Sequence, residues 1–243
     1  EKATPSDRAL LLKAWKKVAE DKKSPLALRR LALQNLQHDA LLQGDGERAE
    51  ALAGKLGWLR DWWLLGPFDR HAPLEELLTG QQDLDLERAW QGKTAKLSWR
   101  KTRSPLADGR LDLHNLLQDD EEVSVLALHR FETKTAGRYL IHVGCDDACT
   151  LWLDGKQVLQ DPGPHSLRPD QRVRALDLAR GPHQLLLRLD QGDGAMGFVM
   201  GLIPSKKDEA LALGPWFVQR AEREGENPEA LADAGRGQGV AAA

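Results

Sequence analysis

The chain has 243 residues, of which 41% are hydrophobic and 29% are charged. This composition is typical of a globular protein with a sizeable core. The formal net charge of −3 gives no reason to expect nucleic acid as a partner. No apolar run approaches the ~20 residues that span a bilayer. The chain starts at Glu1 rather than at a methionine, so we expect a trimmed piece of a longer protein.

Residues 1–57 predict a helical region. Ser6 can cap a first helix, and Ser24 followed by Pro25 is a favourable start for a second. A third helix is predicted from about residue 47 to residue 56, with Gly57 as its C-terminal glycine. Short helices in succession resemble the beginning of a tetratricopeptide-type array.

Residues 58–205 predict an all-β antiparallel sandwich of the jelly-roll kind. Short apolar segments alternate with turn residues, and Asp154-Gly155 is a strong signal for a two-residue hairpin. Because no helical pattern separates these segments, the strands are expected to pair antiparallel. The clearest predicted strands are 123–131, 138–143, 149–153, 172–178, 183–189 and 197–203. Residues 206–243 predict short helices again, which could begin a further repeat.

Four segments in order carry a family resemblance: WWLLGPFD, GKTAKLSWR, RYLIHVGCDDACTLWLDGKQVL and ARGPHQLLLRLDQGDGAMGFVMGL. Together they resemble a galactose-binding-like jelly-roll module of large bacterial envelope proteins, often beside tetratricopeptide or transglutaminase-like domains. The hairpin is also similar to protective-antigen-type sandwich domains of adhesins and glycosidases. The resemblance implies a periplasmic or extracellular location, with the cytoplasm as the alternative. Cys145, Cys149 and Asp154 depart from its usual pattern.

The tryptophans at the start of the sandwich have two interpretations. On a strand, Trp62 and Trp63 point to opposite faces, so one enters the core and the other meets the helical region or solvent. We therefore expect Trp58, Trp62 and Trp63 to help dock the helices on the sheet. The alternative is a platform on which a sugar stacks.

The adjacent carboxylates of Asp146 and Asp147 are the sharpest candidate for a ligand site. They repel one another unless solvent, a cation or backbone donors intervene. In the protective-antigen-type domains that the hairpin resembles, such a pair can help to hold calcium for sugar binding. Calcium needs about 6–8 oxygens, so further ligands would have to converge on the pair. Asp154, Asp161 or loop carbonyls are the predicted further ligands, and Trp152, Asp154 and the loop 161–170 are the predicted sugar contacts. The alternative is that one Asp caps the turn and the other faces water.

Cys145 and Cys149 are the only cysteines and flank a three-residue connection between predicted strands. Residues at such positions can lie about 5.5 Å apart at their Cα atoms, which a disulfide accepts. An oxidising compartment favours the bridge, and a reducing one favours two partly buried thiols.

No catalytic constellation is recognisable in the sequence. The histidines form no zinc-binding pair, and no nucleophile elbow, phosphate-binding loop or dinucleotide-binding glycine run is present. We therefore expect a non-catalytic binding or assembly module that contacts other envelope domains or proteins, with no cofactor apart from the calcium considered above. The alternative is an accessory carbohydrate-binding module, attached to an enzyme elsewhere on the parent chain and binding a glycan.

Overall fold

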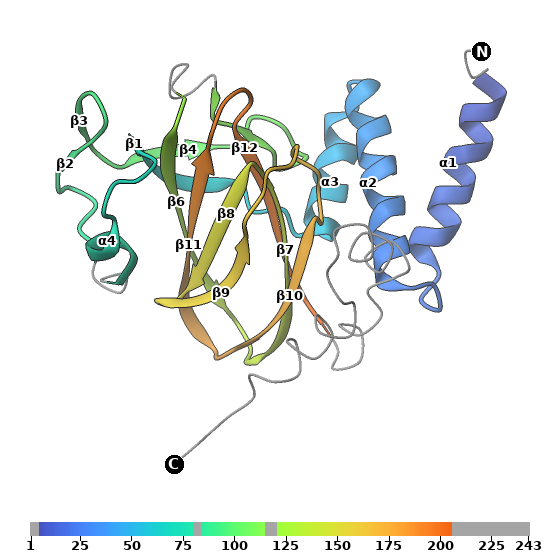
Figure 1. Cartoon of the computed structure of the whole chain (residues 1–243). Coiled ribbons are helices and arrows are strands. Elements are labelled where there is room, and N and C mark those ends of the chain that lie inside the picture. The colour runs from blue at the N-terminus through green and yellow to red at the C-terminus, as the bar shows by residue number, and fades with distance from the viewer. Residues whose placement is uncertain (1–4, 80–83, 115–120, 206–243) are drawn as a thin grey trace.

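The computed structural model describes residues 5–79, 84–114 and 121–205, in which three helices precede a β-sandwich (Figure 1). The helices are α1 (Pro5–Glu20), α2 (Leu26–Leu42) and α3 (Gly46–Leu56). They lie in sequence order, with α1 against α2, α2 against α3, and α3 against the sandwich. The helices predicted within residues 206–243 lie outside the described residues. None of the described helices is long and apolar enough to cross a membrane.

The ends of α3 are set by local chemistry. The Asp45 side chain accepts a hydrogen bond from the Arg48 backbone N–H at 3.1 Å and so caps the first turn. At the other end Gly57 adopts a φ of 68°, and its N–H donates to the Ala53 carbonyl. The predicted C-terminal glycine is therefore confirmed, because this left-handed conformation suits a residue without Cβ.

The sandwich consists of two sheets in which every described pairing is antiparallel. The six-stranded sheet has the order β4 (Arg100–Arg103), β1 (Asp61–Asp69), β6 (Val123–Thr133), β11 (Gly181–Gln191), β8 (Ala148–Leu153) and β9 (Lys156–Asp161). The four-stranded sheet has the order β10 (Arg172–Leu178), β7 (Gly137–Asp146), β12 (Gly197–Pro204) and β5 (Leu111–Asp112). All six strands predicted most clearly are present, and the β-sandwich is confirmed.

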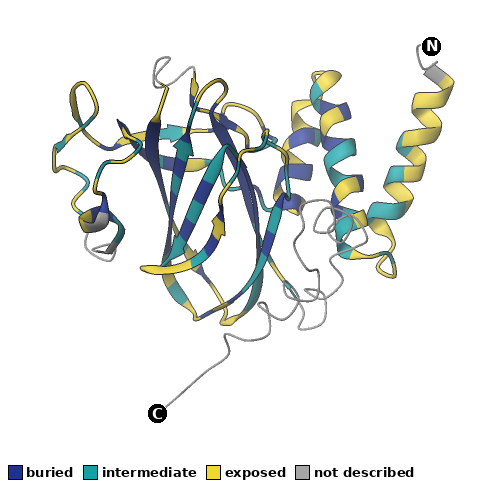
Figure 2. Cartoon of the chain, in the orientation of Figure 1, coloured by how far each residue is buried: buried dark blue, intermediate teal, exposed yellow. Residues whose placement is uncertain are grey.

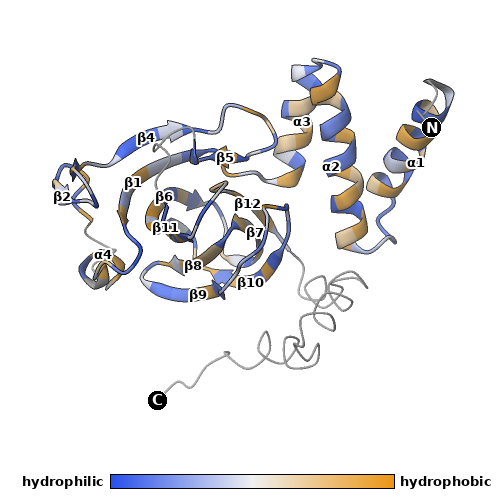
Figure 3. Ribbon diagram, turned by 45° about the horizontal axis from the view of Figure 1, so that its top comes forward, coloured by the Kyte–Doolittle hydropathy of each residue, from blue (hydrophilic) through white to orange (hydrophobic). Residues whose placement is uncertain are grey.

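The segment between β1 and β5 holds elements that were not predicted. It contains the short helix α4 (Glu75–Thr79) and a small hairpin of β2 (Trp90–Gln91) and β3 (Lys96–Leu97). This segment and the helical region lie on opposite sides of the sandwich (Figure 3).

Three apolar clusters hold these layers together, and their members are dark blue in Figure 2. The first lies between the two sheets and includes Trp62, Leu187 and Phe198. The second covers the outer face of the six-stranded sheet beneath α4 and includes Trp99. The third joins the helices to the four-stranded sheet and includes Trp58. Burial on both faces explains why β6 and β11 read as nearly continuous apolar runs.

The tryptophans predicted to dock the helices divide among these three clusters. Trp58 lies in the joint, where its Nε1–H donates to Gln37 Oε1 of α2 at 2.9 Å. Trp62 instead packs in the sandwich core, edge-on to Phe198 with ring centroids 4.8 Å apart. Trp63 packs on the outer-face cluster. Strand alternation sends these two neighbours to the two faces of β1, so neither belongs to the joint cluster.

A buried ion pair adds to the joint. Arg30 of α2 is only 2% exposed, and its guanidinium binds both carboxylate oxygens of Asp170, at 2.9 and 3.0 Å. The same guanidinium donates to the Leu56 carbonyl at 2.9 Å and lies 5.2 Å from the Trp58 ring centroid. Helix and sandwich are thereby fixed by directional bonds as well as by apolar contact.

Candidate functional site

The Asp146–Asp147 turn lies at one end of the sandwich, between β7 and β8. The peptide bond that joins the two residues is cis. Asp146 Oδ2 accepts a hydrogen bond from the Leu167 N–H, and Asp147 Oδ2 accepts one from the Gly192 N–H, both at 3.3 Å. Each carboxylate is thus tied to a different loop at this end of the sheets.

The turn brings two carboxylates together. Burial raises the pKa of Asp146, the Leu167 N–H opposes this, and the adjacent charge of Asp147 raises the pKa further. A cation would relieve both the desolvation and the repulsion. Asp146 and Asp147 therefore fit a calcium ion in part, because together they supply at most four of the roughly 6–8 oxygens required.

Asp161 reaches the same end of the sandwich but is engaged by cationic neighbours. It pairs with Cys149 across β8 and β9, is 1% exposed, and lies 3.1 Å from both Arg172 Nε and Nη2. Burial alone would raise the pKa of Asp161, but the contact with His165 and the charge of Arg172 lower it. It is therefore already neutralised, and its carboxylate serves the loop rather than the Asp146–Asp147 pair.

The other two predicted neighbours lie elsewhere. Asp154 occupies the β8–β9 hairpin at the far end of β8, about 20 Å away for a strand of this length. There it accepts from the Gln184 N–H at 2.8 Å and contacts His183 at 2.6 Å. Trp152 packs against the outer-face cluster. The five predicted residues thus do not form one site, because the length of β8 separates Asp154 from the Asp146–Asp147 turn.

A polar hollow of about 310 Å³ opens beside the turn, on the outer face of the six-stranded sheet. Its lining comes from the β1–α4 turn and from β8, β9 and β11: Arg70, His71, Ala148, Thr150, Gln160, Asp161, Pro162, Arg188 and Asp190. Asp161 and Pro162 belong to the loop 161–170 that was predicted to contact a sugar, and the other lining residues were not predicted. The available signal was Arg188 and Asp190, which alternate as polar residues at the end of an otherwise apolar strand.

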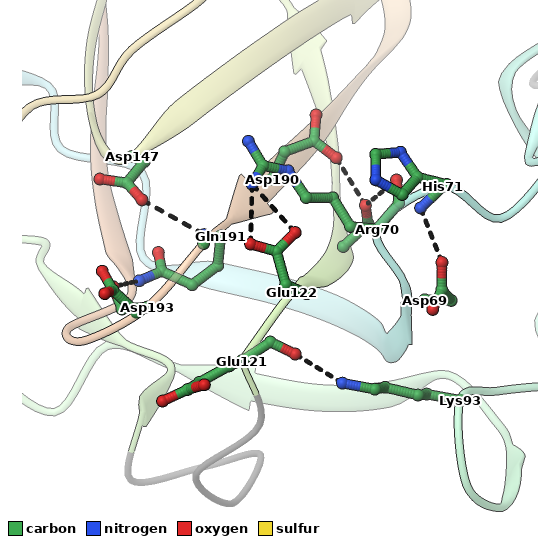
Figure 4. A network of polar contacts seen from close by, with 12 residues as sticks. Asp69, Arg70, His71, Lys93, Glu121, Glu122, Asp147, Asp190, Gln191 and Asp193 are labelled. Atoms are coloured by element: carbon green, nitrogen blue, oxygen red, sulfur yellow. Dashed lines mark hydrogen bonds and ion pairs between the residues drawn. The ribbon is translucent and has the colours of Figure 1, made fainter.

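The charged side chains of the hollow are held by a network that Figure 4 shows in part. Arg188 donates from Nε to Asp190 Oδ1 at 2.8 Å and from Nη2 to the Arg70 carbonyl at 2.9 Å. Ser124, which is fully buried, donates to the same Asp190 oxygen at 2.5 Å. Arg70 in turn contacts Glu122 at 3.1 Å. Both Arg188 and Asp190 are about one-fifth exposed, so they are fixed and still accessible.

No protein-family model and no curated protein sequence matches this chain. Among solved structures, a β-glucosidase from Kluyveromyces marxianus in complex with glucose is similar at 14% identity and a TM-score of 0.41. The match covers 67% of this chain and only 18% of the enzyme. The PA14 domain of the MpAFP antifreeze protein matches at 12% identity and a TM-score of 0.34, over 61% of this chain and 65% of that one.

The PA14 sugar-binding domain of an RTX adhesin matches at 20% identity and a TM-score of 0.28, over 33% of this chain and 46% of that domain. The similar structures thus include a glycosidase and a domain described as sugar-binding. At these scores they carry no inference about the ligand of this chain.

Proposed function

We propose that this chain is a non-catalytic binding module whose sandwich binds a saccharide in the hollow beside the Asp146–Asp147 turn. The observation that carries the proposal is the hollow itself. Its charged side chains are held by a hydrogen-bonded network, and hydroxyl and amide groups line the same space. Saccharides present dense arrays of hydroxyl donors and acceptors, which fixed polar groups recognise without reorganisation.

The dimensions of the hollow favour a small unit. A volume of about 310 Å³ is at the lower limit of ligand pockets, which suits one sugar ring. Thr150 and Gln160 face each other across β8 and β9 and would bond to hydroxyls. Arg188 and Asp190 would supply a fixed donor and acceptor. The lining contains no aromatic side chain other than His71, so we expect weak binding, on the order of 1 mM.

Calcium would enter this function at the turn. Asp146 and Asp147 would hold the ion, and it would supply positive charge and open coordination positions for sugar hydroxyls. The turn and the hollow share one end of the sandwich, because Ala148 and Asp161 line the hollow.

Titration calorimetry with free monosaccharides, preceded by a glycan array, tests the proposal with and without calcium. Thr150→Val and Gln160→Ala should each weaken binding about fivefold, because each removes a hydrogen bond of roughly 1 kcal/mol. The matched controls are Thr102→Val and Gln91→Ala, which lie in β4 and β2 and outside the hollow. No binding heat at sugar concentrations roughly tenfold above 1 mM, or equal losses in the controls, would contradict the proposal.

A second candidate function is assembly with another protein domain through the helical region. Of the six exposed large hydrophobic side chains among the described residues, five lie on α1 and α2: Leu10, Leu11, Leu28, Leu31 and Leu42. A groove of about 630 Å³ lies between the three helices and is floored by Leu33, Leu36 and Leu52. Figure 2 shows how much of α1 is exposed. Such apolar exposure marks interaction sites.

Substituting Leu10 and Leu11 by serine tests this second function. The change should leave folding intact and abolish cross-linking to the neighbouring domain of the parent protein. Unchanged cross-linking would contradict assembly through this apolar surface.

The family resemblance of the sequence segments suggests a finer classification of the fold. We place the sandwich among galactose-binding-like jelly rolls and the helices among tetratricopeptide-like arrays. With a saccharide ligand and other envelope domains as partners, the module would act in the periplasm or outside the cell.

A further inference from the structure

Four metal-ligating side chains meet beneath the Asp146–Asp147 turn. Cys145 Sγ, a carboxylate oxygen of Asp161 and a ring nitrogen of His165 all lie within 4.8 Å of one another. Cys149 is joined to Cys145 by a disulfide, with Cα atoms 6.4 Å apart, and pairs with Asp161 in the sheet. Cys145, Cys149 and Asp161 are each 1% exposed.

We propose that reduction of this disulfide converts the cluster into a zinc site, with Cys145, Cys149, Asp161 and His165 as its four ligands. The spacing C-x₃-C is within the range of zinc-binding cysteine pairs, and D-x₃-H supplies the second pair from the following loop. Two thiolates, one imidazole and one carboxylate form a ligand set that zinc prefers in tetrahedral sites.

The distances require only small movements. His165 Nε2 lies 2.9 Å from Asp161 Oδ2. On a tetrahedral zinc with bonds of about 2.0–2.2 Å, the nitrogen and oxygen would be roughly 3.4 Å apart. Two zinc-bound sulfurs with bonds of about 2.3 Å would be roughly 3.8 Å apart, a separation that reduced thiols adopt in contact. Three of the four ligand atoms already lie within 4.8 Å of one another, and the fourth, Cys149 Sγ, would need to separate from Cys145 Sγ by about 1.5 Å or more.

Asp161 Oδ2 already lies among nitrogens, 2.9 Å from His165 Nε2 and 3.1 Å from Arg172 Nε. A zinc ion at this oxygen would replace these contacts and would supply the positive charge that a buried carboxylate needs. Arg172 Nη2 donates to the other oxygen, Oδ1, at 3.1 Å, so Oδ2 can ligate a metal while Arg172 keeps its hold on Oδ1.

A change of tautomer would prepare His165 to bind the metal. Its Nδ1 lies 3.1 Å from the Cys145 carbonyl and 2.9 Å from Gln171 Nε2. Because Gln171 Oε1 accepts from the Cys145 N–H at 2.8 Å, Gln171 Nε2 donates to Nδ1, and the proton of the neutral ring lies on Nε2 in the disulfide form. Zinc at Nε2 would move that proton to Nδ1, which would then donate to the Cys145 carbonyl, as the outer nitrogen of most metal-ligating histidines does. Gln171 would lose its bond to Nδ1 and keep its bond to the Ser166 carbonyl at 2.8 Å.

Charge balance favours the same ligand set. In the oxidised cluster the Asp161 carboxylate and the Arg172 guanidinium cancel. In the zinc form one Zn²⁺, two thiolates, one carboxylate and one guanidinium also sum to zero. Both states thus avoid leaving an uncompensated charge in a buried site.

The chemistry balances as two steps. A dithiol reductant transfers two electrons and two protons to the Cys145–Cys149 bond and becomes a disulfide itself, which leaves two thiols on the protein. Zinc then binds both sulfurs and releases the two thiol protons. The turn that carries Asp146 and Asp147 is consequently closed in either state, by the S–S bond or by the metal, whether or not the hollow binds a saccharide.

The test uses the full chain, reduced and then freed of reductant without oxygen. Cobalt(II) replaces zinc as a spectroscopic probe, and one equivalent should produce a thiolate-to-cobalt charge-transfer band that zinc then abolishes. Zinc should also protect both cysteines from alkylation, as measured by intact mass. The oxidised protein should show neither effect, because its sulfurs are bonded to each other.

Three variants identify the ligands. Cys149→Ser, Asp161→Asn and His165→Gln should each weaken zinc binding about 100-fold or more, while His38→Gln, at an exposed position of α2, should not. If a variant does not fold, alkylation protection of the unaltered chain still decides the question. The proposal is overturned if the reduced chain shows no band and no protection, or if all three variants bind as the control does.

Discussion

The substitution Asp170→Asn should strongly destabilise the joint between the helices and the sandwich. The side chain keeps its size and loses its charge, so the change removes the counter-charge of Arg30 and alters the contact with His142, which lies 3.3 Å away. Arg30 is 2% exposed and makes both of its contacts to Asp170 at about 3 Å. Gln34 also donates to Asp170, at 2.8 Å. Asparagine would leave the guanidinium buried without a counter-charge.

The expected loss in the free energy of unfolding is about 3–5 kcal/mol, the usual cost when one partner of a buried ion pair is removed. That is a large share of the roughly 5–15 kcal/mol that stabilises a typical domain. The double variant Arg30→Met with Asp170→Asn should lose less than the sum of the two single changes. In the double variant no charge remains stranded, and methionine fills part of the space.

Urea denaturation followed by circular dichroism and tryptophan fluorescence measures these energies. The matched control is Asp61→Asn, which breaks the exposed pair with Arg103 and should cost 1 kcal/mol or less. The reasoning would be refuted if Asp170→Asn lost no more unfolding free energy than Asp61→Asn. It would also be refuted if the losses of the two single changes were strictly additive in the double variant.

Acidification supplies a further check. Burial would raise the pKa of Asp170, but the charge of Arg30 and the contact with His142 outweigh it and hold that pKa far below its usual range. A carboxyl group with a lowered folded pKa contributes stability that is complete above its unfolded pKa of about 3.9. That stability is lost as the pH falls toward the folded value. The difference in the free energy of unfolding between the unaltered chain and Asp170→Asn should therefore decrease below about pH 4.

Removing residues 1–57 should expose the apolar joint and make the sandwich aggregate, as light scattering would show; an unchanged melting temperature would mean that the helices are only tethered. Gly144→Ala should destabilise strongly, because its Cβ would lie 1.9 Å from the Arg168 carbonyl oxygen, whereas Gly137→Ala meets nothing within 4 Å and should melt as the parent does. Protein made in an oxidising compartment should add no alkyl group at Cys145 or Cys149 without reductant, and two added groups in the intact mass would refute the bridge.

The parts of the fold that could be predicted are those with local signals. Gly57 ends α3 because the left-handed turn needs a glycine, and Asp154-Gly155 closes the β8–β9 hairpin with positive φ at both residues. The segment from α4 to β4 could not be assigned, because strands of two residues show no alternation. Its position depends on contacts such as that of Trp99 with the outer-face cluster, which only the folded sheet creates.

The candidate site was predicted in part for a related reason. Asp146 and Asp147 follow directly from the end of β7, and Asp161 returns to them because β9 runs antiparallel to β8. Asp154 lies nearer to them in sequence than Asp161 and yet farther in space, since the length of β8 separates the two ends. Arg70 and Arg188 are 118 residues apart, and only the pairing of β1, β6 and β11 brings them together. No spacing rule reaches that far.

Strand β8 connects the two proposed sites through its alternation. Cys149 and Leu151 face the core between the sheets, whereas Thr150 lines the hollow on the outer face. The sulfur chemistry and the polar hollow therefore lie on opposite sides of one strand, a single residue apart. Because Cys149 is tied to Cys145 and pairs with Asp161, the backbone that positions Thr150 is held from the inner side. A disulfide or a zinc ion on the inner face would thus keep the outer face in one shape, which a site built from short polar side chains requires.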